Sequence, residues 1–135
     1  MNTRRILMGT IVLGIVANAM DWVLNKFLWP SIFASLPWIN PNPQLMWLII
    51  GDFAAAFMLM LAWDRFGSVG GRGPGAGFRF GAFAGAFISF PAVLFWQMYI
   101  KDFPYAVAWE LIVVNVIFMG ILGAVAAMLD GKATA

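Results

Sequence analysis

The chain contains no cysteine and no histidine, and only 10% of its 135 residues are charged. These absences exclude disulfides, thiolate chemistry, His-ligated haem, most zinc sites and histidine acid–base catalysis. The net charge of +2 is too small, and its basic residues are too scattered, for a nucleic-acid-binding surface. We therefore expect no metal, no cofactor, no catalytic residues and no nucleic-acid partner, and the sequence favours a non-enzymatic protein.

Apolar residues dominate what is present: 63% of the chain is hydrophobic and its mean hydropathy is +0.88. A soluble domain carries roughly 25% charged residues and mixes them through its apolar runs. Here four apolar segments, at about residues 6–29, 45–63, 77–100 and 105–129, approach or exceed the roughly 20 residues that span a bilayer. We predict an all-α fold, in which residues 1–135 form one integral membrane four-helix bundle.

The first segment has a second interpretation as a secretory signal. Arg4 and Arg5 precede the apolar run Ile6–Val16, and Ala17-Asn18-Ala19 fits a small-x-small cleavage pattern. Apolar residues continue past this point as far as Leu28, and the total length is sufficient to span a bilayer. We favour a retained helix, and cleavage of residues 1–19 stays the alternative.

Basic residues predict the orientation of the bundle. Six of them fall on one side of the predicted spans: Arg4, Arg5, Arg65, Arg72, Arg79 and Lys132. Only Lys26 and Lys101 fall on the other side. Since loops rich in lysine and arginine stay in the cytoplasm, we expect both termini and the Gly-rich linker 66–75 to be cytoplasmic.

The third segment carries a small residue at every fourth position: Gly77, Gly81, Gly85 and Ser89. On a helix these residues form one ridge, which lets a neighbouring backbone approach closely in lipid. The fourth segment carries a second small-residue face: Gly120, Gly123, Ala124 and Ala127. The two faces are expected to pack together, either within the chain or between chains, which leaves a homo-oligomer or a larger membrane complex open. Pro91 is expected to bend the third helix.

Polar residues inside the predicted spans gather in the outer half of the membrane. A carboxylate at mid-helix costs about 2.5–3.5 kcal/mol on insertion scales, so Asp52 and Glu110 are expected to face protein or water. We predict a vestibule, open to the outside and ringed by tryptophan, that receives a small ligand or a lipid headgroup. Its candidate ligand-binding residues are Asn18, Asp21, Asn25, Asp52, Trp96, Gln97, Glu110 and Asn115.

Two structural explanations compete with the vestibule. The polar groups can simply hydrogen-bond one another and hold the bundle together, with Lys26 or Lys101 neutralising a carboxylate. The tryptophans can form an aromatic belt at the headgroups instead of a pocket. Those at the outer level are Trp22, Trp29, Trp38, Trp47, Trp96 and Trp109.

A transporter is the second functional hypothesis. Asp52 and Glu110 are then the groups that handle a small solute or a proton. Transport requires access from both sides of the bilayer, whereas the inner half of the predicted bundle offers no polar path. We therefore rank a binding or accessory role in the lipid bilayer first.

The last segment also carries a resemblance. Asn115, followed by Met119-Gly120-Ile121-Leu122-Gly123, resembles the last helix of small four-helix bacterial membrane proteins catalogued only as a domain of unknown function. Trp22 late in the first segment and the glycines that open the third are similar too. The resemblance implies the fold, the topology and the bacterial inner (plasma) membrane, and it implies no activity.

Overall fold

A computed structural model describes residues 3–34, 36–37, 39–40, 42, 44–67 and 71–132, with the side chains of all of these except 131 and 132. The helices are α1 (Thr3–Phe27), α2 (Trp29–Phe33), α3 (Leu45–Phe66), α4 (Pro74–Tyr99) and α5 (Tyr105–Lys132). No strand occurs among the described residues. Trp38, which was assigned above to the outer tryptophans, and positions 68–70 of the predicted linker lie outside them.

The prediction of an all-helical chain with four long apolar helices is confirmed. Within the described residues, four helices have apolar spans of 22 to 26 residues, long enough to cross a membrane. Helices α3 and α5 continue past the apolar segments predicted at 45–63 and 105–129, because the flanking charged residues also adopt helical structure, as Asp64 and Arg65 do at the end of α3. Helix α1 instead ends at Phe27, before the predicted limit of 29. The proline-rich connection contains the short helix α2, in which Pro30 occupies the first turn, where its missing N–H costs nothing.

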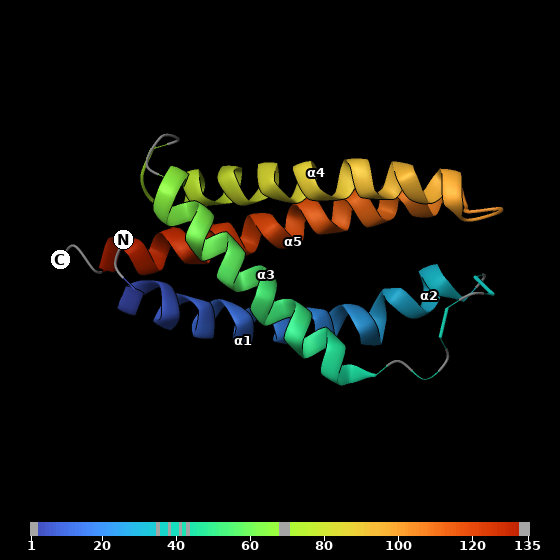
Figure 1. Cartoon of the computed structure of the whole chain (residues 1–135), viewed down its shortest axis with the longest axis horizontal. Helices are drawn as coiled ribbons and strands as arrows, with labels where there is room; N and C mark the ends of the chain where they lie inside the picture. The colour runs from blue at the N-terminus through green and yellow to red at the C-terminus, as the bar shows by residue number, and fades with distance from the viewer. Residues whose placement is uncertain are drawn as a thin grey trace.

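The long helices form two packed pairs (Figure 1). Helices α4 and α5 lie side by side along their length, and α3 crosses α1. Contacts of α5 with α1 and with α3 join the pairs, whereas α3 and α4 pack little on each other although they are consecutive in the chain. We call the end that holds both termini the terminal end, and the end that holds α2 and the α4–α5 turn the turn end (Figure 1).

Glycine explains the close packing of α4 on α5. A methyl group built on Gly77 would collide with the carbonyl oxygen of Gly123, and one built on Gly81 would collide with that of Met119. The two backbones therefore approach to a distance that no larger residue permits, as small residues allow in membrane helices. Helix α4 runs through Pro91 as one helix.

Buried apolar side chains form two clusters. The terminal cluster joins all four long helices: Ile6, Leu13, Ala17, Ala56, Leu59, Met60, Trp63, Ala76, Met119, Leu122, Ala126 and Ala127. The turn cluster joins α4 and α5 to the connection that follows α2: Leu36, Val93, Phe103, Val107, Ala108 and Ile112. Leu36 thus fastens the α2 connection onto the α4–α5 pair.

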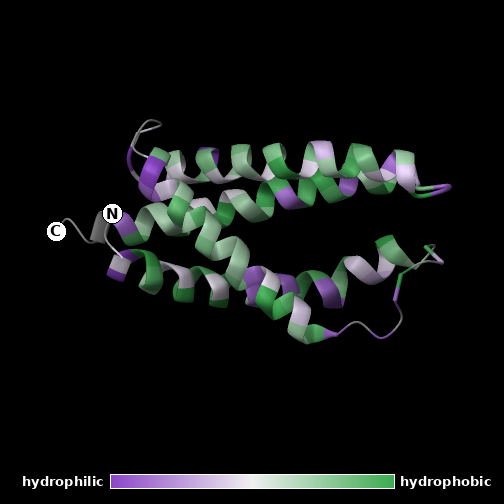
Figure 2. Cartoon of the chain, in the orientation of Figure 1, coloured by the Kyte–Doolittle hydropathy of each residue, from purple (hydrophilic) through white to green (hydrophobic). Residues whose placement is uncertain are grey.

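Hydrophilic residues interrupt the apolar helices at several places. Figure 2 shows them at the terminal end, where α3 crosses α1, along α5 and in the α4–α5 turn, with apolar stretches of helix between. At the terminal end, Arg5 of α1 pairs with Asp64 of α3 and with Asp130 of α5. Trp63 adds a hydrogen bond from its indole Nε1 to Asp130 Oδ2, at 3.3 Å. One arginine therefore ties three helices together.

Candidate functional site

A pocket of about 360 Å³ is lined by residues of both helix pairs and of α2. Four polar side chains line it, two from each pair: Asp21, Asp52, Ser89 and Asn115. Most of the remaining lining is apolar, and it includes residues of both buried clusters, Val93 of the turn cluster and Met119 of the terminal cluster. We call this cavity the acidic pocket.

The carboxyl groups of Asp21 and Asp52 are direct neighbours in this pocket. Asp52 is only 7% exposed, and its Oδ2 is buried without a hydrogen-bond donor among the described residues. Ionised carboxylates accept hydrogen bonds and cannot donate them. The two groups therefore repel each other unless a proton or a cation lies between them.

The crossing of α1 and α3 places this pair. The ring of Phe53 occupies the space that a side chain on Gly14 would fill, so α3 approaches α1 closely at this point. Asp52 immediately precedes Phe53 in the chain. Asp21 follows Gly14 by seven residues, which is nearly two helical turns, and it therefore lies on the same face of α1. Both side chains line the same pocket beside the crossing.

Helices α4 and α5 supply the other polar wall. The hydroxyl of Ser89 donates a hydrogen bond to the Gly85 carbonyl at 2.6 Å, and Asn115 Nδ2 donates to the same carbonyl at 3.3 Å. Since the hydroxyl proton of Ser89 is used in this way, its oxygen can only accept further hydrogen bonds. The pocket therefore presents two carboxylates and an acceptor hydroxyl.

Two tryptophans line the pocket between these walls. Trp29 belongs to α2 and stacks on Phe33 at 5.2 Å, and Trp96 meets Phe103 edge-on at 6.1 Å. Trp22, Trp47 and Trp109 are exposed and do not line the pocket, and Trp96, which does line it, is itself 44% exposed. Trp96 therefore combines a place in the pocket lining with an exposed face.

Half of the predicted ligand-binding residues meet in the pocket. Asp21, Asp52, Trp96 and Asn115 line it. The amide of Asn18 instead donates to the Gly14 carbonyl at 2.9 Å, and that of Asn25 to the Asp21 carbonyl at 2.8 Å. Both bonds stay within α1.

Glu110 and Gln97 are exposed and do not line the pocket. Glu110 precedes Asn115 by five residues, which corresponds to about 140° around a helix. The two side chains therefore leave α5 on different faces, and only Asn115 turns inward. Lys26, considered above as a counter-charge, places its ammonium over the ring of Trp22, 4.9 Å from the centroid.

The candidate ligand-binding residues named from the sequence did not include Ser89 and Trp29, and the charge cluster at the terminal end was not predicted. Ser89 was assigned to the packing ridge, yet it is where that ridge reaches the pocket. The signal in the sequence was the hydroxyl of Ser89, because the other three residues of the ridge are glycines. Trp29 was assigned to the end of the first segment, whereas it begins α2. No local pattern links Arg5 to Asp130, which is 125 residues away.

Comparison of the chain with protein families, with curated proteins and with solved structures gave no match. Among the described residues, no group of three or more acidic side chains is placed to hold a metal ion.

Proposed function

We propose that this chain is a multi-pass protein of a bacterial inner membrane that binds a small organic cation in the acidic pocket, without catalysing a reaction. The observation that carries the proposal is the neighbouring pair Asp21 and Asp52, of which Asp52 is 7% exposed and has a buried oxygen without a donor. A positively charged partner stabilises a buried carboxylate whose oxygen has no hydrogen-bond donor. An acidic side chain embedded in a membrane is also a functional group by default.

The lining of the pocket supports an organic cation over a metal ion. A divalent metal needs six or more oxygen ligands in the case of Ca²⁺, or a strict octahedron in the case of Mg²⁺. Here two carboxylates stand among mainly apolar side chains, with Trp29 and Trp96 beside them. Tryptophan faces attract alkylammonium groups, by about 0.5–2 kcal/mol each. The combination of paired acids and aromatic rings matches an ammonium group.

The distribution of charge supports the orientation. Arg4, Arg5 and Arg65 belong to the terminal end, together with Arg72, Arg79 and Lys132, and Lys26 and Lys101 belong to the turn end. A cytoplasmic terminal end satisfies the positive-inside rule. The acidic pocket then lies nearer the outer surface, because the terminal cluster fills the bundle on its cytoplasmic side.

The same arrangement favours binding over transport. The terminal cluster includes the fully buried Leu13, Met60 and Leu122, which fill the interior between the pocket and the terminal end. Glu110, the second acid of the transport hypothesis, stands outside the pocket. We therefore favour a ligand that enters from the outer side and stays bound over a solute that crosses the bilayer.

Calorimetric titration tests this proposal. The purified protein in a neutral detergent is titrated with tetraethylammonium chloride, and we expect saturable binding that Asp52→Asn abolishes. Glu110→Gln is the matched control, because it removes an exposed acid of the same membrane half, and it should bind as the unaltered protein does. Equal binding by the Asp52→Asn variant, or no saturable binding by any of the three, overturns the proposal.

A flux measurement separates binding from transport. The same proteins are reconstituted in liposomes and the uptake of radiolabelled tetraethylammonium is followed. We expect no uptake above that of protein-free liposomes. Uptake that disappears in the Asp52→Asn variant would replace the binding role by a transport role.

A further inference from the structure

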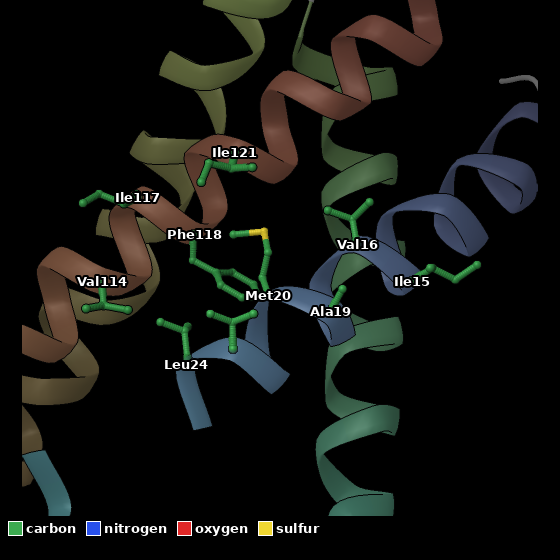
Figure 3. Close-up of a pocket in the computed structure, with 10 residues that line it drawn as sticks. Ile15, Val16, Ala19, Met20, Leu24, Val114, Ile117, Phe118 and Ile121 are labelled. Carbon is green, nitrogen blue, oxygen red and sulfur yellow. The ribbon is translucent and has the colours of Figure 1, made fainter. Parts of the chain in front are cut away.

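A second cavity lies directly beside the acidic pocket, between α1 and α5 (Figure 3). It measures about 650 Å³, and all ten residues that line it are apolar. Its rim is exposed on both helices, with Ile15 60% and Val23 47% exposed on α1 and Ile117 50% exposed on α5. We call it the apolar groove; in a bilayer its open side meets lipid tails.

The apolar groove and the acidic pocket share a wall. Leu24 of α1 and Val114 and Phe118 of α5 line both cavities. Figure 3 shows Phe118 meeting Met20 between the two helices, with Val114 next to Leu24. All three side chains are half-buried. A flexible chain passes from one cavity to the other when these three side chains change rotamer.

We infer that the ligand is an amphiphilic amine, which places its ammonium group between Asp21 and Asp52 and its alkyl tail in the apolar groove. The inference rests on the proposed function and adds the tail. The two carboxylates attract the positively charged head into the acidic pocket. The tail enters the groove past Leu24, Val114 and Phe118, which line both cavities. Such a ligand reaches the site sideways from the bilayer, and its tail never leaves an apolar environment.

The position of the groove agrees with this route. The groove extends along α1 from Ile15 to Leu24 and along α5 from Val114 to Ile121, toward the middle of both spans. Asp21 and Asn115 of the acidic pocket lie within the same two stretches of chain. The tail of a ligand whose head is at Asp21 therefore points from the pocket toward the bilayer centre, as the tails of the surrounding lipids do.

Photochemical labelling tests the path of the tail. The protein in phosphatidylcholine nanodiscs is illuminated with a dodecylamine that carries a diazirine at mid-chain, and the labelled peptides are identified by mass spectrometry. We expect labels on residues 15–24 and 114–121, at least about tenfold stronger than with the corresponding diazirine dodecanol, because the alcohol has no charge for the aspartates. Asp52→Asn should reduce the amine's labelling to that of the alcohol.

A second experiment blocks the groove without touching the aspartates. Ala19 lines the groove and is exposed, so that Ala19→Phe places a ring in the groove and leaves the buried clusters intact. The matched control is Ala54→Phe, at an exposed alanine of α3 that does not line the groove. We expect Ala19→Phe to lower dodecylamine labelling at least about tenfold, and to leave tetraethylammonium binding unchanged.

The outcomes distinguish the two proposals. Saturable tetraethylammonium binding together with tail labels on α3 and α4, near Ala55 and Ala92, would overturn the inference and leave the proposed function standing. Labels spread evenly over the lipid-facing residues, or equal labelling by the amine and the alcohol, would overturn the inference in the same way. Absence of saturable tetraethylammonium binding would overturn the proposed function itself.

Discussion

Arg5, in the first turn of α1, donates a hydrogen bond from Nη1 to Oδ1 of Asp130 near the end of α5, at a distance of 2.5 Å. The same guanidinium donates from Nη2 to Asp64 of α3. The side chain of Arg5 is 24% exposed and that of Asp64 is 8% exposed, whereas that of Asp130 is 36% exposed, so the Arg5–Asp64 side of the cluster is the one screened from solvent. A planar guanidinium is suited to this task, because it presents its donors in a fixed fork.

Replacement of Arg5 is expected to loosen the terminal end. Arg5→Gln leaves the carboxylates of Asp64 and Asp130 without their cation, and we expect a loss of about 1–3 kcal/mol of unfolding free energy. Thermal unfolding followed by tryptophan fluorescence measures it. Arg4→Gln is the matched control, because Arg4 is exposed. Equal destabilisation by the two variants would show that only net charge matters at this end.

Gly81→Ala is expected to be destabilising although alanine favours helices. The added methyl group would collide with the carbonyl oxygen of Met119, and neither backbone can move aside without displacing the other helix. We expect a loss of about 1–3 kcal/mol, as for other overpacked sites. The control is Gly51→Ala in α3, where a methyl group meets nothing within 4 Å. That variant should gain about 0.5–1 kcal/mol from helix propensity.

Asp52→Asn is expected to stabilise the protein in the absence of ligand. The amide replaces a repelling carboxylate with a donor that can bond to Asp21, and we expect a gain of about 1 kcal/mol in unfolding free energy. Stability then rises while cation binding is lost, as is common where a site is kept for function. Thermal unfolding of the ligand-free protein measures the change, and Glu110→Gln should leave it unaltered. A destabilised Asp52→Asn variant would contradict the proposed electrostatic conflict.

Leu36→Ala is expected to release α2. Leu36 is 6% exposed in the turn cluster, and its truncation leaves a cavity that costs about 2–4 kcal/mol. Hydrogen exchange should then accelerate in α2 and remain slow in α4. Leu45→Ala removes the same atoms from a side chain that is 64% exposed, and should change stability by less than about 0.5 kcal/mol. Unchanged exchange in α2 would mean that Leu36 does not fasten it.

The sequence predicts the four long helices, but it does not predict which side chains meet where these helices pack. Apolar length and flanking charge predict four long helices, because a helix that crosses a bilayer needs about 20 apolar residues. The acids of the pocket were harder to pair. Asp52 and Glu110 look alike in the sequence, and only the crossing of α3 over α1 at Gly14 decides that Asp52 meets Asp21. Such a choice depends on helix rotation, which packing sets and local pattern does not.

Since α3 and α4 pack little on each other, the chain is divisible between them. One fragment would keep the α1–α3 crossing and the other the α4–α5 pair, so that each half retains its closest packing. The contacts of α5 with α1 and α3 would then become a bimolecular association with a measurable dissociation constant. Asp21 and Asp52 belong to one fragment, Ser89 and Asn115 to the other. By linkage, a cation bound among them would raise the affinity of the two fragments for each other.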